Sequence, residues 1–356
     1  MTASRHIAIV GAGIAAATCA RTLLQDGHRI TVFERSHTLG GRMATRNSPF
    51  GTFDHGAQYF TVHDPRFMQA VQATPTVCKP WSANVTQLLD EQGHNTAPSS
   101  IATHEPHWVA SPGMSTLAKH WLQPLLEARC IEMQTCVIAI ERDSLNRAQW
   151  QLRTEGQDDS CHVYGGFDAV LLAIPAPQAQ VLLKDVAQAQ ALVAQTAAVK
   201  MSPCWTLMLA FPQAMQPDLS ALGPQWNAAR SMHQRIAWLS RESSKPGRSQ
   251  IERWTVQAST TWSRDHLHDD AQRVQAKLVK TFAELTGIHA EPSYVDTKRW
   301  LYARTEMPLG QSHLWDHTSG LGLCGDWCLG SLVEDAYVSG LELALSVAKT
   351  WEVGAG

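Results

Sequence analysis

The residues best placed for chemistry lie near the N-terminus of this 356-residue chain, where glycines follow one apolar run and an acid follows another. The run Ile7–Val10 enters the G-x-G-x-x-A turn Gly11–Ala16, and the next apolar run ends at Glu34. Gly11 permits a tight turn, and Gly13 lets backbone amides approach a pyrophosphate at a helix N-terminus. An acid about 20 residues beyond the glycines can hydrogen-bond a ribose hydroxyl. The spacing therefore predicts a dinucleotide-binding βαβ unit.

A second group of glycines follows the acid. Within Gly40–Arg42, the paired glycines would let the backbone lie against a phosphate, and the guanidinium of Arg42 could bind that phosphate through two hydrogen bonds. Far along the chain, a buried-strand pattern ends at Asp326, and Ser331–Glu334 has the form of a capping box that opens a helix. The positive N-terminal end of that helix would favour negative charge on a bound cofactor.

Composition excludes several classes of protein. Hydrophobic residues make up 44% of the chain and charged residues 17%, which describes a compact globule with a substantial core and two domains. The formal net charge of −3 gives no reason to expect nucleic acid or an anionic membrane as a partner. No apolar run approaches the length of a bilayer span, and Ile7–Ala20 fits a nucleotide fold better than an export signal. We therefore expect a cytoplasmic protein without a membrane or nucleic-acid partner.

Cysteine and histidine could bind a metal, but their spacing argues against it. The eight cysteines include no C-x-x-C pair, and we expect them to be reduced thiols. The densest histidine cluster, His266–Asp270, precedes an amphipathic helix, so Asp269 and Asp270 more simply serve the start of that helix. The sequence therefore predicts no metal site.

Over nearly its whole length the chain resembles the renalase group of the flavin amine oxidase superfamily. The resemblance rests on the motifs G-G-R-M-A-T-R, F-D-H-G-A-Q-Y-F, S-P-G-M-S, W-T-V-Q-A-S-T-T-W-S and G-D-W-C-x-G-S-x-V-E-x-A-x-x-S-G. It implies an α/β fold in which a Rossmann-type FAD-binding domain carries a discontinuous α+β substrate domain, as in amine-oxidase-like two-domain flavoproteins. We assign the FAD-binding domain to residues 1–75, 105–178 and 296–356, and the substrate domain to residues 76–104 and 179–295.

The cofactor that the resemblance implies is FAD, bound without a covalent link, although attachment through Cys328 stays open. The resemblance places the flavin ring near His55–Gln58 and near the N-terminus of the last helix. It places Val137 at the adenosine and Asp326 at the ribityl or pyrophosphate region. The expected cofactor-binding residues are Gly11, Ala12, Gly13, Ile14, Ala15, Ala16, Glu34, Arg35, Gly41, Arg42, Met43, His55, Gly56, Ala57, Gln58, Val137, Asp326 and Val333.

The resemblance also implies an activity. Renalases are understood to oxidise the 2- and 6-dihydro isomers of NAD(P)H, passing the hydride to FAD and then to oxygen, with NAD(P)+ and hydrogen peroxide as products. We therefore expect an FAD-dependent oxidase whose partners are a small flat substrate and molecular oxygen. Orientation of the substrate over the flavin would supply most of the catalysis, and no catalytic acid–base dyad is predicted.

Four residues are expected to line the substrate pocket: Tyr59, Trp254, Gln257 and Arg299. Gln257 could hydrogen-bond a carboxamide, and Arg299 could meet a phosphate. Three positions depart from the pattern of the group, with Gln257 where many relatives have histidine, Leu301 where arginine is common and Asp335 where glycine is usual.

Other functions stay open. A flavin amine oxidase acting on a small amine would keep the same cofactor motifs, although Leu329 stands where many such enzymes carry an aromatic residue. A desaturase or protoporphyrinogen-type oxidase would need a longer apolar substrate-binding or membrane-binding region, which the sequence lacks. A non-catalytic flavin-binding sensor is the alternative from a different class, and reduction of bound FAD by a small molecule would exclude it.

Overall fold

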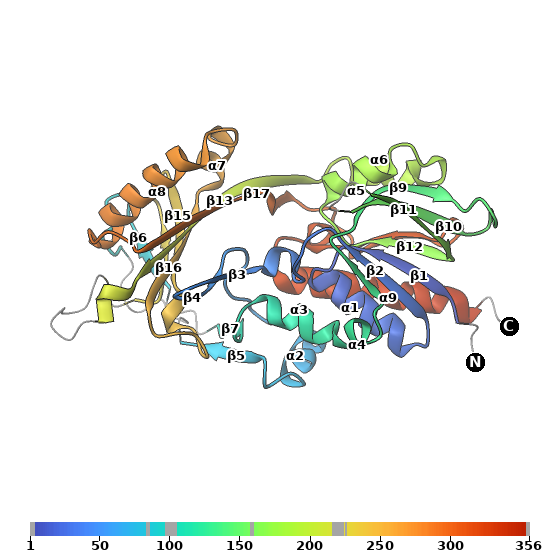
Figure 1. Ribbon diagram of the computed structural model, residues 1–356, viewed down its shortest axis with the longest axis horizontal. Helices are drawn as coiled ribbons and strands as arrows, with labels where there is room; N and C mark the ends of the chain where they lie inside the picture. Colours follow the sequence, from blue (N-terminus) through green and yellow to red (C-terminus); the bar gives the residue numbers. More distant parts are fainter. Residues whose placement is uncertain are drawn as a thin grey trace.

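The chain forms two halves that long strands connect (Figure 1). Segments from the beginning and the end of the chain share one half, and both ends of the described chain lie at its outer side. The computed structural model describes residues 4–82, 86–96, 105–156, 160–215, 224 and 226–353.

A six-stranded sheet with the order β18-β19-β12-β1-β2-β8 forms the centre of the first half. Its strands run parallel except for β18, which pairs antiparallel with β19. They are β1 (His6–Val10), β2 (Arg29–Glu34), β8 (Ile131–Met133), β12 (Ala169–Leu172), β18 (Leu314–Asp316) and β19 (Leu321–Leu323). The βαβ unit predicted from the glycine pattern is confirmed as β1, α1 (Ile14–Gln25) and β2.

Apolar side chains bury this sheet on both faces. Successive residues of β1 point in opposite directions, with Ile7 and Ile9 in one core cluster and Ala8 and Val10 in another. Helices α1 and α9 (Val333–Val353) cover the first face, and the antiparallel sheet β11-β10-β9 covers the second.

Helices α1 and α9 pack so closely that one position between them requires glycine. A Cβ added to Gly340 would lie 2.2 Å from the carbonyl oxygen of Ala15. This contact ties the last helix of the chain to the first turn of α1.

A second six-stranded sheet, with the order β17-β13-β16-β15-β14-β6, forms the other half. Its strands are β6 (Gln87–Leu89), β13 (Lys200–Phe211), β14 (Ala228–Ser231), β15 (Ile236–Arg241), β16 (Glu252–Ala258) and β17 (Tyr294–Met307). Helix α8 (Ala271–Thr286) covers one face with Val274, Leu278 and Phe282. The other face turns toward the first half, and Gln257 and Trp300 make hydrogen bonds across the gap.

The start of α8 confirms the role predicted for Asp270, which is the N-cap and accepts hydrogen bonds from the amides of Gln272 and Arg273. Asp269 lies just before the N-cap and forms an ion pair with Lys277, about two turns further along.

Shorter elements complete the structure. The remaining helices are α2 (Pro65–Gln72), α3 (Ser115–Trp121), α4 (Gln123–Glu127), α5 (Ala176–Leu183), α6 (Gln190–Thr196) and α7 (Thr260–Asp265). The remaining strands are β3 (Thr45–Ser48), β4 (Gly51–Asp54), β5 (Cys78–Trp81), β7 (His107–Ala110), β9 (Cys136–Arg142), β10 (Trp150–Glu155) and β11 (Cys161–Phe167). Single 3-10 turns lie at Gly41–Met43, Ala187–Ala189, Pro212–Met215, Glu242–Ser244 and Asp326–Cys328.

Strand β17 bears on the predicted division into domains. The sequence assigns residues 296–356 to the FAD-binding domain, whereas β17 pairs with β13 of the second sheet along most of its length. The division itself remains a prediction, and a boundary that follows the strand pairing would lie after Met307.

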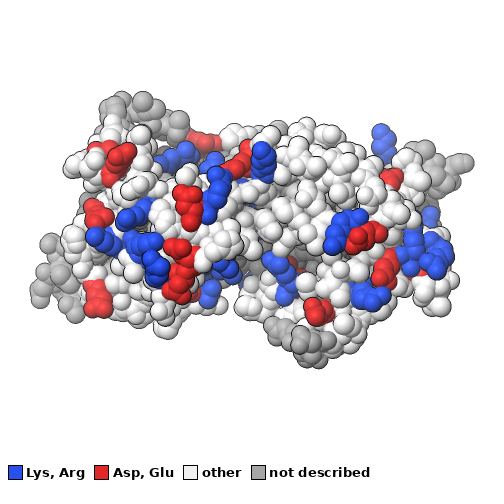
Figure 2. All heavy atoms as spheres, turned by 90° about the horizontal axis from the view of Figure 1, so that it is seen from above, with Lys and Arg blue, Asp and Glu red and all other residues white. Residues whose placement is uncertain are grey.

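The described residues contain no helix with the length and apolar character needed to cross a membrane. In the same residues, no group of three or more His, Cys, Asp or Glu side chains is arranged to hold a metal ion. Acidic and basic side chains are interspersed over the described part of the face in Figure 2.

Candidate functional site

The predicted phosphate loop connects β1 to α1. Gly11 has a φ of 101°, and a Cβ there would lie 2.7 Å from the carbonyl oxygen of Ala173, so the turn requires glycine. Helix α1 starts at Ile14 with Gly13 as its N-cap, and no side chain caps it. The first amides of α1 are therefore available to an anion.

Glu34 ends β2 beside this loop. Its Oε2 accepts a hydrogen bond from the amide of Ala12 at 2.9 Å, and its Oε1 accepts one from the amide of Ser36 at 2.8 Å. The carbonyl of Glu34 accepts from the amide of Thr135 at 2.9 Å, which brings the start of β9, with Val137, to the same place. The acid and the valine predicted for the adenosine end of the cofactor thus lie together.

Several predicted cofactor residues turn their side chains into the core. Ala12, Ile14, Ala15, Ala16 and Met43 belong to the first hydrophobic cluster. Only their backbone can face a cofactor. Arg35, by contrast, is exposed at the end of β2.

Arg42 is held by an acid from the far end of the chain. The guanidinium makes a two-point ion pair with Asp326, in which Nη1 lies 2.8 Å from Oδ2. Asp326 is buried, and it also accepts a hydrogen bond from the hydroxyl of Thr305 at 3.3 Å. The turn before Arg42 lies close to the phosphate loop, since a Cβ on Gly41 would be 3.1 Å from the Cα of Gly13. Asp326 therefore fixes the direction of Arg42 beside that loop.

The segment His55–Gln58 passes directly over the backbone of Arg42. The amide of Ala57 donates to the carbonyl oxygen of Arg42 at 2.8 Å. A Cβ on Gly56 would lie 1.9 Å from the same oxygen, so this position also requires glycine.

His55 is a neutral, buried histidine. Its ring stacks on Trp300 with the ring centroids 5.3 Å apart, and the indole nitrogen of Trp300 donates to the carbonyl of His55 at 2.9 Å. Burial, together with the positive charges of Arg46 and Lys298, lowers the pKa of His55 to about 4. Among the described residues, its Nδ1 atom has no hydrogen-bond partner.

The capping box predicted at the start of α9 is wrong. Glu334 does not reach back to Ser331 but accepts hydrogen bonds from two amides in the loop before α2. Asp335 instead accepts from the amide of Leu332 at 2.8 Å. The reason is that α9 begins at Val333, which puts Asp335 at the third helical position, from which an acid reaches the N-cap amide.

One row of side chains crosses the second sheet and faces the loop that carries Gly56. The row consists of Trp238, Gln257, Thr206 and Lys298, paired across β15, β16, β13 and β17. Residues paired in this way point to the same face of a sheet. Gln257 confirms which face this is, because its Nε2 donates to the carbonyl of Gly56 at 2.8 Å.

The expectation that Trp254 lines the pocket is wrong. Trp254 lies three positions before Gln257 in β16, an odd separation, so its side chain points to the opposite face. It is fully buried beneath α8 and packs edge-on against Trp226 and Phe282.

The expectation for Arg299 is wrong for the same reason. Arg299 is paired with Trp205 on the far face, and its Nη1 donates to the carbonyl of Leu267 at 2.7 Å. The inward position belongs to the preceding residue, Lys298.

Tyr59 stands in a group of aromatic rings that sequence analysis missed. Its ring centroid lies 4.2 Å from that of His107, 5.4 Å from that of Trp238 and 6.2 Å from that of Trp81. Trp238 also donates to Oε1 of Gln58 at 2.7 Å. These rings come from four separate segments, so no local pattern in the sequence could have predicted the group.

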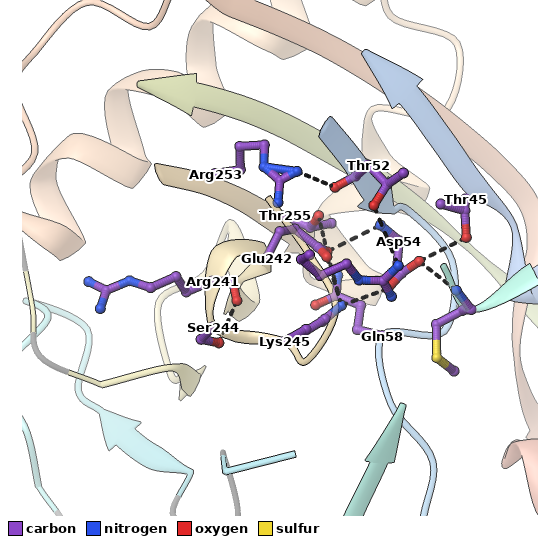
Figure 3. A network of polar contacts seen from close by, with 12 residues as sticks. Thr45, Thr52, Asp54, Gln58, Arg241, Glu242, Ser244, Lys245, Arg253 and Thr255 are labelled. Carbon is purple, nitrogen blue, oxygen red and sulfur yellow. Dashed lines mark hydrogen bonds and ion pairs between the residues drawn. The ribbon is translucent and has the colours of Figure 1, made fainter. Parts of the chain in front are cut away.

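Next to this aromatic group lies a buried ionic cluster that sequence analysis also missed (Figure 3). Lys245 Nζ lies 3.0 Å from carboxylate oxygens of both Asp54 and Glu242, and Arg248 Nη2 lies 2.6 Å from Asp54. All four side chains are fully buried. Lys245 also lies 5.6 Å from the ring centroid of Trp81, so the cluster supports a wall of the aromatic group.

The arrangement fits FAD. The close approach of Gly13 and Gly41 leaves backbone rather than side chains beside the uncapped amides of α1, which is what a pyrophosphate needs. In this arrangement Glu34 would hold the ribose and Arg42 the pyrophosphate. The segment His55–Gln58 would then run along the ring.

Replacing Glu34 by alanine should weaken FAD binding by about 1–3 kcal/mol, because the ribose loses its acceptor and the Ala12 amide loses its partner. Titration of the apoprotein with FAD, followed by flavin fluorescence, measures the effect. The Glu34→Gln variant, which keeps one acceptor oxygen, should lie between alanine and the wild type. An unchanged FAD affinity in Glu34→Ala would show that the acid does not bind the ribose.

Comparison with protein families assigns almost the whole chain. Residues 84–347 match the family described as flavin containing amine oxidoreductase, and residues 9–74 match the NAD(P)-binding Rossmann-like domain. A curated relative, the L-amino-acid oxidase of Siganus canaliculatus, is 46% identical over 56 residues. That match covers 15% of this chain and 11% of the relative, so the shared part is about a tenth of the curated protein.

Two solved structures have the same fold. A proposed protoporphyrinogen oxidase from Exiguobacterium sp. 255-15 superposes with a TM-score of 0.75 at 14% sequence identity. Cyclohexylamine oxidase from Brevibacterium oxydans IH-35A superposes with a TM-score of 0.70 at 12% identity. Each comparison covers 98% of this chain and 100% of the other. At these identities the likeness concerns the fold alone.

Proposed function

The chain belongs to the flavin-containing amine oxidoreductase family, and from that premise we propose that it is an FAD-dependent oxidase of 2- or 6-dihydro isomers of NAD(P)H. Its products would be NAD(P)+ and, from oxygen, hydrogen peroxide. Bound FAD would supply the acceptor for the hydride. The chain's own residues would bind the substrate, orient it and shield it from water.

The proposal rests on two features of the site: aromatic rings that could contact a planar substrate, and a glutamine side chain whose orientation is fixed by a hydrogen bond. Tyr59 and Trp238 provide aromatic faces for a planar ring. Gln257 uses its Nε2 on the carbonyl of Gly56, which leaves its Oε1 to accept a hydrogen bond from a carboxamide. A dihydronicotinamide has both features, a planar ring and a carboxamide.

The charge around the site argues against the rival substrate, a small amine. Lys298 lies on the same face as Gln257 and has no carboxylate partner among the described residues. Its positive charge disfavours the binding of a protonated amine beside it. A dihydronicotinamide ring is neutral and meets no such repulsion.

We also propose that FAD is held without a covalent bond. Cys328, the cysteine that could have carried it, is fully buried, and burial raises the pKa of its thiol to about 12. A thiol with such a pKa is not a reactive nucleophile at neutral pH.

Anaerobic mixing of the purified protein with 2- and 6-dihydro-NAD(P), and in parallel with small amines, tests the proposed function. Rapid bleaching of the visible flavin band by the dihydro isomers alone is the expected result. Bleaching by amines would establish the rival activity, and bleaching by neither class would favour a flavin-binding protein without turnover.

A further inference from the structure

Lys298 presents a positive charge to the candidate substrate site from the middle of β17. It is paired in register with Thr206, which is paired in turn with Gln257. Two strand spacings, about 10 Å in total, therefore separate Lys298 from Gln257 on one face of the sheet. Trp300 is the next residue on this face, and Nζ of Lys298 lies 5.7 Å from its ring centroid.

No residue in the described part of the chain neutralises this charge through a hydrogen bond or an ion pair. The nearest acid on the same strand face, Asp296, is already paired with Arg46 at 3.1 Å. Lys298 is partly buried, so its ammonium group keeps some contact with solvent and is free to pair with an anionic ligand. We therefore expect a bound ligand to supply the anionic group that pairs with Lys298.

A second, independent observation points to a ligand at the same place. His55 packs against Trp300 beside Lys298, is 6% exposed, and carries the Nδ1 atom that lacks a partner among the described residues. Because the ring is neutral, it can donate one hydrogen bond without adding charge. Lys298 and His55 both contact the ring of Trp300, and a cation with a neutral donor near it suits an anion with several acceptor oxygens.

We propose that Lys298, with His55 beside it, binds a phosphate group of the substrate and makes the protein selective for nucleotides over the corresponding nucleoside. This proposal rests on the proposed function and names the part of the substrate that the second half of the site recognises. Lysine binds phosphate as a point charge and needs no bidentate geometry. The pyridine ring would stay at Tyr59 and Gln257, with the ribose between the two ends.

The test compares three substrates that differ only in phosphate. Rates of flavin reduction are measured for the dihydro isomers of NAD, nicotinamide mononucleotide and nicotinamide riboside, with wild type and Lys298→Met. The variant should raise KM for the two phosphorylated substrates about 10-fold or more and leave kcat and the KM of the riboside unchanged. Lys298→Arg should restore most of the discrimination.

Arg299→Met is the matched control. It removes a positive charge from the adjacent residue, on the opposite face of the same strand, and should leave all three KM values unchanged. Quenching of tryptophan fluorescence by NAD+ and by nicotinamide riboside gives a second readout that does not depend on turnover. There, Lys298→Met should weaken NAD+ binding alone.

The outcomes separate this proposal from the function on which it rests. If the wild type reduces its flavin with none of the three substrates, the proposed function fails, and the fluorescence measurement alone decides whether Lys298 binds phosphate. If turnover occurs but Lys298→Met changes the three KM values equally, the phosphate assignment is wrong. A loss of bound FAD in Lys298→Met would show that the lysine binds the cofactor's phosphates, and that result also overturns the assignment.

Discussion

Asp54→Ala is expected to lower the free energy of unfolding by about 3–5 kcal/mol, because it breaks a fully buried ion pair and leaves the cations behind. Asp54 accepts hydrogen bonds from Lys245, Arg248 and Thr45 at distances of 2.6–3.0 Å, and from the amide of Met114 at 2.9 Å. None of the charged side chains touches water, so solvent cannot replace the lost carboxylate. Urea unfolding of the holoprotein, with the midpoint and the slope both recorded, measures the change.

The contacts of Asp54 with Lys245 and Arg248 also predict that the free energy of unfolding depends on pH. Burial alone would raise the pKa of Asp54, but Lys245 and Arg248 outweigh burial and hold that pKa below its usual range. A carboxylate with a lowered pKa stabilises the fold above its unfolded pKa of about 3.9, and this contribution is lost as the pH falls further. The difference between wild type and Asp54→Ala should therefore be largest near neutral pH and shrink below about pH 4.

Glu141→Gln provides the control for the Asp54 variant. Glu141 forms an ion pair with Arg153 whose side chains are 38% and 50% exposed, and such pairs contribute about 0–1 kcal/mol. If Asp54→Ala and Glu141→Gln change stability equally, the buried contacts of Asp54 contribute no more than an exposed ion pair, and the prediction is wrong.

Arg42→Ala should yield a protein that loses most of its FAD during purification. The guanidinium N–H groups that Asp326 leaves free would no longer bind the pyrophosphate, and each charge-assisted hydrogen bond lost contributes about 1.5–3 kcal/mol. The deletion also leaves the buried carboxylate of Asp326 without its main partner, which places a negative charge beside the phosphates. The ratio of flavin absorbance to protein absorbance, followed by FAD titration of the apoprotein, measures both effects.

Two further variants test whether the loss of FAD comes from the missing contacts between Arg42 and the pyrophosphate. Arg42→Lys keeps the charge but not the planar fork, so its FAD affinity should fall between wild type and Arg42→Ala. Arg5→Ala removes an arginine of the same half at the N-terminal end of β1, where it pairs with Asp168, and should retain normal flavin content. Unchanged flavin in Arg42→Ala would sink the assignment of Arg42 to the pyrophosphate.

The sequence determines those parts of the site that depend on neighbours along the chain. The turn at Gly11, the acid at Glu34 and the N-cap at Asp270 each follow from residues within one βαβ unit or one helix start, because φ, ψ and capping are decided by adjacent residues. The same reasoning from neighbouring residues placed the N-cap of α9 at Ser331, one residue before the observed N-cap at Leu332. There, Glu334 is drawn away by the loop before α2, a partner that lies far from it in the sequence.

The tertiary structure alone decided which side chains face the candidate site. In a strand, adjacent side chains point to opposite faces of the sheet. Only the pairing of β13, β16 and β17 shows that Lys298 faces the site and Arg299 does not, and that Gln257 and Trp254 lie on opposite faces. The aromatic group around Tyr59, the pair between Arg42 and Asp326 and the ionic cluster at Asp54 likewise join segments from distant parts of the chain. Such contacts form only once the two sheets have been assembled in a given register. The residue types and spacing within one segment do not show which distant segment it will contact.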